Sequence, residues 1–400
     1  MVEKIEFLSP GTITAPAGFI AGAAYGGLNK HAPFKLDVGL LLSQTPCTAA
    51  GVFTQNQIKS APVLLCQEHL RVPTVRAVVA NSGCANANTG TEGRQDAQSM
   101  AEAAAAKAGI RATEVLVLST GVIGRRLPID SLRQAVAAIE LTPQGGHLLA
   151  RAIMTTDTVP KETACRAGDF IIGGIAKGAG MIHPNMATML CVLTTDAAAP
   201  ADFLAAALKA AVDKSFNMIS VDGDTSPNDT VLLLANGMSG QRIVDSEDGT
   251  ALFQKALDET CIRLAKAIAR DGEGATKLIE VVVRGADTLS AAQDAARTIV
   301  SSSLVKTAIH GADPNWGRII AAAGRSPARI EAEKLALTMC DVPVMRNGAP
   351  LDFDSQYLSS LLHRDEITIE LHLGLGEAAA TAWGCDLSAK YVAINAEYTT

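Results

Sequence analysis

Thr188 is the residue whose position most strongly suggests chemistry. It ends the glycine-rich segment "KGAGMIHPNMAT" (177–188) and directly precedes the apolar run "MLCVLTT". A threonine hydroxyl becomes a nucleophile when a nearby base removes its proton, and a free α-amine can be that base because its pKa is about 7.7–8.0. Thr188 would carry such an amine only after cleavage of the bond to Ala187. We therefore interpret Ala187–Thr188 as a self-cleavage site; the alternative is a β-branched residue that merely begins a strand.

Nucleophilic attack on a carbonyl group produces an oxyanion, which hydrogen-bond donors must stabilise. The segment "LSTGVIG" (118–124) ends an expected strand at Thr120 and Gly121, whose hydroxyl and backbone N–H could supply two donors. The competing interpretation of Ser-Thr-Gly after a strand is a plain turn. The segment "GGIAKGAG" (173–180) is not a phosphate-binding loop, because no Gly-Lys-Ser/Thr follows with the required spacing. Thr120 and Gly121 are therefore candidates for an oxyanion hole.

Other polar segments admit ordinary structural explanations. "MTTDTVPK" (154–161) follows an expected helix, where local side-chain hydrogen bonds are the default. "RDGEGATK" (270–277) carries Glu273 between glycines, as a solvated loop would. "VDGDTSPNDT" (221–230) has aspartates that could hold a cation, but it lacks the twelve-residue pattern of a calcium loop. Cys84 is a further nucleophile candidate, although no base that would pair with it can be named.

The composition is that of a compact enzyme. The chain has 400 residues, of which 48% are hydrophobic and 19% charged, enough for two domains or for one large domain with a subdomain. The net charge of −7 argues against nucleic acid as the main partner. The N-terminal residues lack the apolar core of a signal peptide, and no apolar run of about 18 residues predicts a membrane span. We therefore expect a cytoplasmic protein with no membrane partner.

The cysteines and histidines do not form a metal-binding pattern. The eight cysteines include no Cys-x-x-Cys pair, and the seven histidines are scattered. This spacing disfavours zinc, and reduced thiols are the simpler interpretation in a chain of this size. We expect neither a metal nor a cofactor.

The order of elements predicts an α/β protein with mixed sheets. The alanine-rich stretch 94–108 predicts a helix that Gly109 ends. We place a boundary after residue 287, between a catalytic domain (1–287) and a smaller C-terminal α/β domain (288–400). The remaining expected helices are 128–141, 200–216 and 250–269, and the expected strands are 114–120, 169–178, 188–197, 231–236, 277–285, 304–311 and 366–374.

Taken together, these segments resemble the ornithine acetyltransferase family of arginine biosynthesis. The resemblance covers essentially the whole chain, and its most specific segment is "KGAGMIHPNMATML" (177–190). It implies a fold similar to that of the self-processing, N-terminal-nucleophile-like aminopeptidases related to DmpA. The other segments that carry it are "NSGCANANTG", "LSTGVIGRRLP", "MTTDTVPK", "SVDGDTSPNDT", "DGEGATK", "KTAIHGADPNWGRI" and "AINAEYTT".

The resemblance also implies a reaction and its residues. The precursor would cleave itself into α (1–187) and β (188–400) chains, two of each assembling together, with Thr188 as nucleophile and Thr120 and Gly121 as oxyanion hole. Acetyl would pass from N-acetylornithine to glutamate, and acetyl-CoA is a second donor in some members. Thr156 is an alternative to Thr155 in one contact. The matching substrate-binding positions are Thr155, Lys177, Thr188, Glu273, Asn395 and Thr400.

Two other functions remain open at this point. A self-processing aminopeptidase or amidohydrolase of the same fold would use water as the acceptor, with the same nucleophile and oxyanion hole. A binding protein that retains the fold without catalysis would need neither the Ala187–Thr188 junction nor the Thr-Gly pair. The intact junction and pair favour an enzyme.

Overall fold

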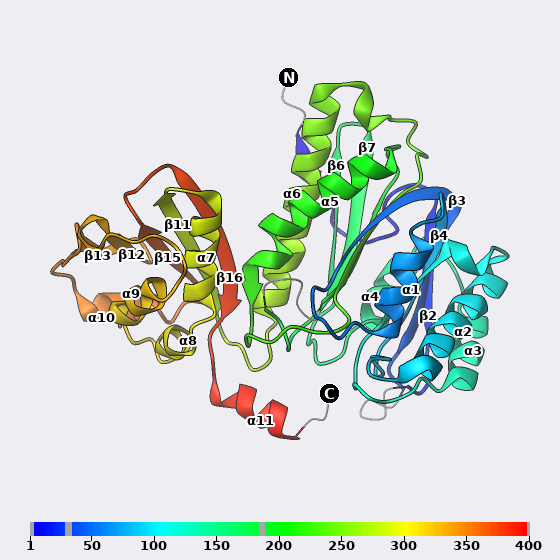
Figure 1. Cartoon of the computed structure of the whole chain (residues 1–400), viewed down its shortest axis with the longest axis horizontal. Helices are drawn as coiled ribbons and strands as arrows, with labels where there is room; N and C mark the ends of the chain where they lie inside the picture. The colour runs from blue at the N-terminus through cyan, green and yellow to red at the C-terminus, as the bar shows by residue number, and fades with distance from the viewer. Residues whose placement is uncertain (1–3, 29–33, 184–188, 398–400) are drawn as a thin grey trace.

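The computed structural model describes residues 4–28, 34–183 and 189–397. The predicted cleavage site, Ala187 and Thr188, and the predicted substrate contact Thr400 lie outside the described residues. The protein has two lobes of unequal size (Figure 1). The larger lobe holds most of the first 270 residues, and the smaller lobe holds most of the remainder.

The larger lobe is built on a nine-stranded mixed sheet in the described part of the chain, with the order β1-β6-β7-β8-β10-β3-β4-β5 and with β2 paired to β3. The longest strand, β3, pairs with β10 along one half and with β2 and β4 along the other, and its register shifts between Leu42 and Cys47. The strands are β1 (Ile5–Phe7), β2 (Phe19–Ala24), β3 (Val38–Phe53), β4 (Val75–Asn81), β5 (Val115–Ser119), β6 (Lys161–Ala167), β7 (Phe170–Lys177), β8 (Leu190–Thr195) and β10 (Thr230–Ala235).

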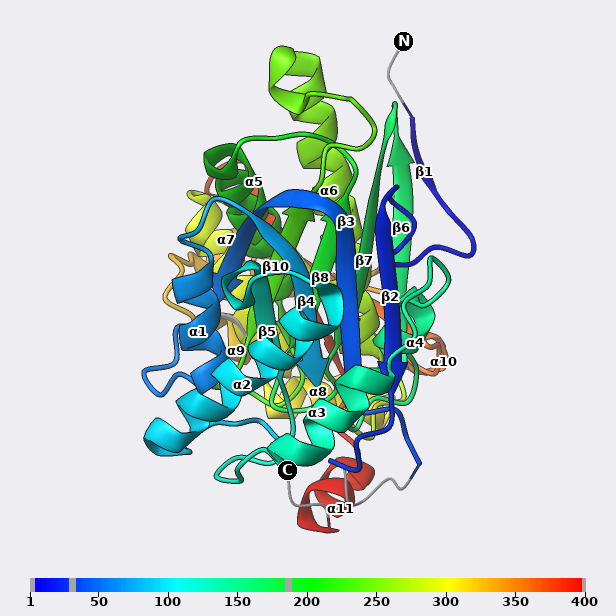
Figure 2. The same ribbon diagram turned by 90° about the vertical axis from the view of Figure 1, so that its right-hand side faces the viewer.

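This shift lets the two halves of the sheet pack against each other. Side chains alternate between the faces of a strand, and in β8 Cys191 and Leu193 belong to one core cluster while Leu190 and Val192 belong to a second. The second cluster also contains Leu116 of β5, so it lies between the two halves. Helix α4 (Gly146–Ala152) contributes Leu149 and Ala150 to the same cluster. Other helices cover the outer faces (Figure 2): α1 (Ala61–His69), α2 (Gly90–Ala108), α3 (Ile129–Ala138), α5 (Ala201–Lys214) and α6 (Glu247–Arg270).

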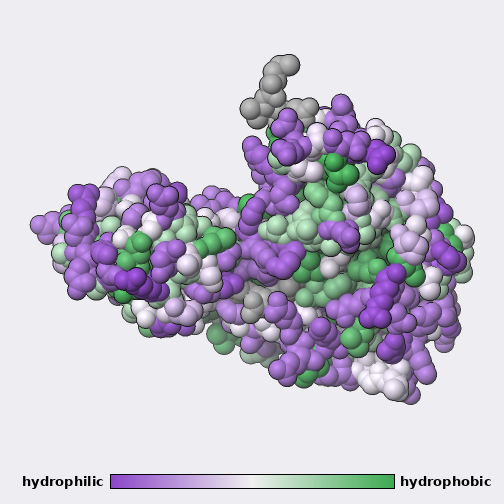
Figure 3. All heavy atoms as spheres, turned by 45° about the horizontal axis from the view of Figure 1, so that its top comes forward, coloured by the Kyte–Doolittle hydropathy of each residue, from purple (hydrophilic) through white to green (hydrophobic). Residues whose placement is uncertain are grey.

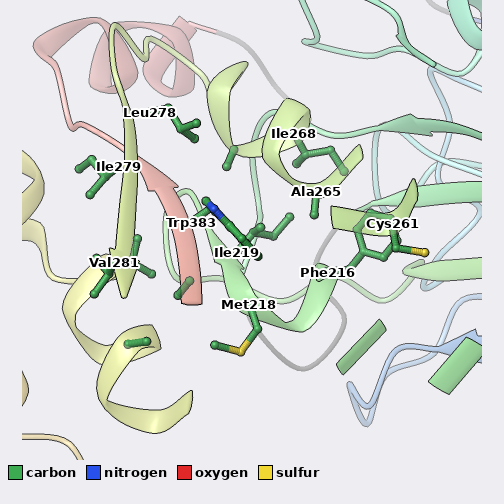
Figure 4. Packing of buried hydrophobic residues seen from close by; sticks show 14 of the residues in the cluster. Phe216, Met218, Ile219, Cys261, Ala265, Ile268, Leu278, Ile279, Val281 and Trp383 are labelled. Atoms are coloured by element: carbon green, nitrogen blue, oxygen red, sulfur yellow. The ribbon is translucent and has the colours of Figure 1, made fainter. Parts of the chain in front are cut away.

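The smaller lobe contains a seven-stranded sheet in the described residues, with the order β14-β13-β12-β15-β11-β16-β9. Its helix α7 and the end of α6 enclose a shared core with β11 and β16, in which Phe216, Ile268 and Trp383 converge (Figure 4). The elements are β9 (Ile219–Ser220), β11 (Leu278–Ala286), α7 (Leu289–Val300), α8 (Ser303–His310), α9 (Trp316–Gly324), β12 (Ala336–Met339), β13 (Val342–Arg346), β14 (Ala349–Pro350), α10 (Ser355–Leu361), β15 (Glu366–His372), β16 (Ala378–Cys385) and α11 (Ala389–Glu397).

Most elements agree with the expected ones, and one expectation was wrong. Gly109 ends α2 in the left-handed conformation, with φ 66°, as its sequence position predicted. The segment 304–311, expected as a strand, is helix α8. Its buried apolar residues Val305, Ala308 and Ile309 stand at positions i, i+3 and i+4, so they share one face of a helix. The β-branched residues in this short segment had favoured a strand, and burial of that face decided the outcome.

The α/β class with mixed sheets is confirmed by the two sheets. The boundary placed after residue 287 stays a prediction; it follows β11, which pairs with β15 and β16 of the second sheet. No helix among the described residues is long and apolar enough to cross a membrane.

All eight cysteines, each within the described ranges, are buried and free. Hydrophilic residues cover most of the smaller lobe in Figure 3.

Candidate active site

The ends of β7 and β5 and the starts of β8 and β10 come together beside candidate residues, because the two halves of the first sheet face each other. Lys177, the last residue of β7, pairs with Leu190 at the head of β8, and Leu190 also pairs with Thr230 at the head of β10. β5 ends at Ser119, directly before Thr120 and Gly121. The sheet topology thus places the start of β8, two residues after Thr188 in the chain, beside segments far apart in sequence.

A pocket beside these strand ends contains every described residue that the sequence assigned to the site. Thr155 and Thr156 both line it, so the geometry leaves both as contacts. Thr188 and Thr400 lie outside the described residues. The lining residues are Ala85, Thr120, Gly121, Ile123, Thr155, Thr156, Lys177, Gly180, Met181, Asp222, Asp224, Ser226, Asn228, Glu273, Tyr391 and Asn395.

The candidate oxyanion hole has a backbone that requires glycine. Gly121 has φ 126°, and a Cβ atom there would lie 2.4 Å from the carbonyl carbon of Gly83 and 2.6 Å from the nitrogen of Cys84. The preceding residue is held by a hydrogen bond of 3.1 Å from the Thr120 amide to the Asn81 carbonyl. Gly121 therefore allows the loop after β5 to approach the loop after β4 closely.

Cys84 does not have the environment of a nucleophile. Its side chain is fully buried, and its thiol lies 3.0 Å from the Arg125 carbonyl, to which it donates. Burial raises the pKa of the Cys84 thiol, so the reactive thiolate is disfavoured. The interpretation of Cys84 as nucleophile is therefore not supported.

Lys177 directly contacts the candidate oxyanion hole. The residue is 2% exposed, and its ammonium group donates to the Thr120 hydroxyl oxygen at 3.1 Å. Because an ammonium can only donate, Thr120 is the acceptor, and its own hydroxyl hydrogen can point to another acceptor. Burial lowers the pKa of Lys177, while the nearby carboxylate of Asp157 acts in the opposite direction. The Lys177 ammonium therefore polarises the Thr120 hydroxyl, and both side chains line the pocket.

Asp157 fixes two segments that line the pocket, the one at Thr155 and the one at Gly178 directly after Lys177. Its carboxylate accepts hydrogen bonds from the Thr155 amide at 2.9 Å, the Gly178 amide at 2.7 Å and the Lys161 ammonium at 2.6 Å. Burial alone would raise the pKa of Asp157, but Lys161, Lys177 and these donors lower it to about 2. Sequence reasoning had assigned Asp157 only local hydrogen bonds. The lysine four residues later was the signal that it missed.

Lys161 connects these segments to the loop that carries Glu273. The same ammonium donates to the Asp271 carboxylate at 2.6 Å, and the Thr158 amide donates to it at 3.0 Å. Two segments more than 100 residues apart in sequence are therefore joined beneath the pocket by buried charges.

Glu273 forms the acidic wall of the pocket. It is 7% exposed and accepts a hydrogen bond of 2.7 Å from the Asn395 side chain, which reaches it from α11. Gly180 makes room for this carboxylate, because a Cβ there would lie 2.5 Å from its Cδ atom. The pocket is therefore lined by groups of both charges, with Lys177 as a cation and Glu273 as an anion. Such a pocket suits an amino acid, which carries both a carboxylate and an ammonium group.

The ArgJ family model matches residues 21–400. The chain belongs to this family. The arginine biosynthesis bifunctional protein ArgJ of Dehalococcoides mccartyi strain CBDB1 is 51% identical over 405 residues, which cover 100% of both chains. The protein of the same name from Symbiobacterium thermophilum is 50% identical over 403 residues, or 99% of this chain and 100% of that one.

A solved structure of the family is also similar. The crystal structure of arginine biosynthesis bifunctional protein ArgJ from Bacillus halodurans is 43% identical, with a TM-score of 0.50, and the match covers 51% of this chain and 97% of that chain. The family expected from the sequence, the ornithine acetyltransferases of arginine biosynthesis, is therefore confirmed.

The contact between Lys177 and Thr120 predicts a coupled loss of activity in this ArgJ chain. Lys177→Met removes the charged donor, and we expect kcat to fall about 10²–10³-fold, as when one oxyanion-hole donor is removed. Thr120→Val should cost a similar factor. Because both side chains act on the oxyanion through one hydroxyl, the double variant should lose little more kcat than Thr120→Val alone, whatever Lys177 contributes to KM.

Transfer rates per cleaved chain for the three variants test this coupling. Lys209→Met is the matched control, because its side chain is 72% exposed, and it should retain the wild-type kcat. Losses that multiply in the double variant would contradict a shared hydroxyl.

The low pKa of Asp157 predicts a pH-dependent contribution to stability. Its pKa is lower in the folded protein than the ordinary 3.8, so the stabilisation is present above about pH 4 and is lost as the pH falls towards 2. We expect Asp157→Asn to lower the free energy of unfolding by about 3 kcal/mol at pH 7, because it breaks a buried ion pair. The difference from wild type should shrink below about pH 4.

Urea unfolding at several pH values measures this difference. Asp352→Asn, at an exposed aspartate, should stay within about 0.5 kcal/mol of wild type throughout. A difference between Asp157→Asn and wild type that stays constant down to pH 2 would exclude the assigned ion pair as its source.

Proposed function

We propose that this chain is a self-processing acetyltransferase that moves the acetyl group of N2-acetyl-L-ornithine to L-glutamate through an acetyl-Thr188 intermediate. The observation that carries the proposal is the pocket, which unites Thr120, Lys177 and Glu273 beside the head of β8. Membership of the ArgJ family over residues 21–400 supports it. The products are ornithine and N-acetylglutamate, and the pathway is arginine biosynthesis.

The first step is maturation. The Thr188 hydroxyl attacks the Ala187 carbonyl carbon, the peptide C–N bond breaks, and the hydroxyl proton ends on the nitrogen that becomes the Thr188 α-amine. Water then hydrolyses the resulting ester, which releases the Ala187 carboxylate and restores the hydroxyl. The α-amine created in this way is the base that activates the same hydroxyl for transfer.

The second step is acetyl transfer in two halves. The Thr188 hydroxyl attacks the acetyl carbonyl of N-acetylornithine, and its proton passes through the α-amine to the departing amine of ornithine. The amine of glutamate then attacks the acetyl-threonine ester and loses a proton as the hydroxyl is restored. Thr120 and Gly121 donate to the oxyanion in both halves. Lys177 polarises the Thr120 hydroxyl across a distance of 3.1 Å.

The charged groups of the pocket can orient the amino acid. We assign Glu273, with Asn395, to the side-chain ammonium of ornithine, and Lys177 to the substrate carboxylate. Thr155 and Thr400 complete the assigned contacts. No cofactor is needed in this scheme, because the acetyl group travels on the threonine.

Three finer features belong to the same proposal. The curated relatives are named bifunctional, which supports acetyl-CoA as a second acetyl donor here. Two αβ units would form the complete assembly. A cytoplasmic location is supported by eight cysteines that are all free and buried.

Thr188→Ala tests the nucleophile. We expect two fragments from the wild-type protein, split before Thr188, and one full-length chain from the variant, because alanine has no hydroxyl to attack the Ala187 carbonyl. Denatured intact mass measures this result. A cleaved variant, or an uncut wild-type protein at every pH and temperature tried, would refute the self-processing mechanism.

Assays of the cleaved enzyme with and without glutamate test the acceptor. Ornithine release should depend on glutamate, with N-acetylglutamate formed in equal amount. Release of free acetate at the same rate without glutamate would assign the chain instead to the amidohydrolases.

Glu273→Gln tests the assigned substrate contact. We expect the KM for N-acetylornithine to rise about 10–100-fold, because a charge-assisted hydrogen bond contributes about 1.5–3 kcal/mol. Glu366→Gln, at an exposed glutamate of β15, is the control and should leave KM unchanged. An unchanged KM in Glu273→Gln would remove this carboxylate from the binding contacts.

A further inference from the structure

The aspartate-rich loop 221–230, to which the sequence assigned no function, contacts the chain on both sides of the predicted cleavage site. On the upstream side, the Asp222 carboxylate accepts hydrogen bonds from the Met181 amide at 2.6 Å and the Ile182 amide at 2.8 Å. The Val221 amide returns a hydrogen bond of 2.7 Å to the Ile182 carbonyl. Met181 has φ 55°, so these contacts hold a backbone conformation that residues with a side chain rarely adopt.

On the downstream side, the same loop holds the residue that follows Thr188. The Asp229 carboxylate accepts a hydrogen bond of 3.0 Å from the Met189 amide, and the Thr230 amide donates to the Met189 carbonyl at 3.2 Å. Both backbone polar groups of Met189 are therefore hydrogen-bonded to this loop. Asp229 itself is fully buried, which rules out a merely solvated carboxylate.

The loop between these two contacts is anchored to the body of the larger lobe. The Asn228 side chain donates to the Ala85 carbonyl at 2.6 Å and the Ser119 carbonyl at 2.8 Å, which ties the loop to the residues before the candidate oxyanion hole. The Thr54 amide donates to the Asp229 carbonyl at 3.0 Å. The loop that carries the Asp222 and Asp229 carboxylates is thus fixed to the larger lobe by hydrogen bonds.

We propose that Asp222 and Asp229 are positioning residues for self-cleavage, which hold the chain on either side of the Ala187–Thr188 bond so that the Thr188 hydroxyl meets the Ala187 carbonyl. Attack within one chain requires the reacting atoms to be held about 3–3.5 Å apart, and fixing both ends of a short segment limits the conformations that it must search. The proposal rests on the self-processing mechanism given above.

The two aspartates should respond differently to replacement by asparagine. Both carboxylate oxygens of Asp222 accept amide hydrogen bonds, so asparagine must lose one of them. Only Oδ1 of Asp229 is used, and Oδ2 is buried without a hydrogen-bond partner among the described residues. Burial also raises the pKa of Asp229 well above its usual range. Asparagine, which resembles a protonated carboxyl, can therefore keep the contact with Met189.

The experiment follows self-cleavage of the full-length chain over time by denatured intact mass, with no substrate present. We expect Asp229→Ala and Asp222→Asn each to slow cleavage at least about tenfold, and Asp229→Asn to stay within about threefold of wild type. Asp352→Asn, at an exposed aspartate outside the loop, is the matched control and should cleave at the wild-type rate.

A further measurement separates a positioning role from general loss of stability. The thermal midpoint of Asp229→Asn should match or exceed that of wild type, because it relieves a buried carboxylate of its desolvation.

Cleavage at the wild-type rate in both Asp229→Ala and Asp222→Asn would overturn the positioning role, as would equal loss in Asp229→Asn and Asp229→Ala. These results are distinct from a failure of the self-processing mechanism. In that case the wild-type protein would itself remain uncut, or Thr188→Ala would be cleaved.

Discussion

The buried pairing of Asp157 with Lys161 is the interaction on which the pocket depends. One carboxylate holds the Thr155 and Gly178 amides, and one ammonium joins it to Asp271. A buried ion pair of this kind adds little net stability over an apolar pair, but losing one partner leaves a charge unpaired in the interior. Its effect here is geometric, because it fixes the wall that carries Lys177 relative to the loop that carries Glu273.

The long strand β3 supplies the frame for that geometry. Its register shift lets one strand take part in both halves of the sheet, so that apolar residues of β8 and β5 share one core cluster. The same arrangement brings the ends of β7 and β5 together, so that Lys177 reaches Thr120. Positioning catalytic groups on strand ends, which packing holds rigid, gives better defined distances than placing them on free loops.

In the proposed mechanism, substrate chemistry and self-processing share the same structural parts. Asp222 lines the pocket and also holds Met181, while Asn228 lines it and ties loop 221–230 to Ser119. A cleavage segment fixed between such groups would present Thr188 to the pocket as soon as the bond before it is broken. This shared use explains why an aspartate-rich loop without a metal-binding pattern is built with so many backbone contacts.

The sequence by itself predicted the chemistry and determined much of the secondary structure. Local covalent and conformational rules are enough to interpret three features. These are the threonine after Met-Ala at the start of an apolar run, the Thr-Gly pair after a strand, and the helix that Gly109 ends. The tertiary structure alone decided the partners. Three features depend on residues that are distant in the chain. They are helix 303–310, the ion pair of Lys161 with Asp271, and the hydrogen bond from the Met189 amide to Asp229. Such contacts form only when burial of the core brings those segments together, and no local pattern encodes that burial.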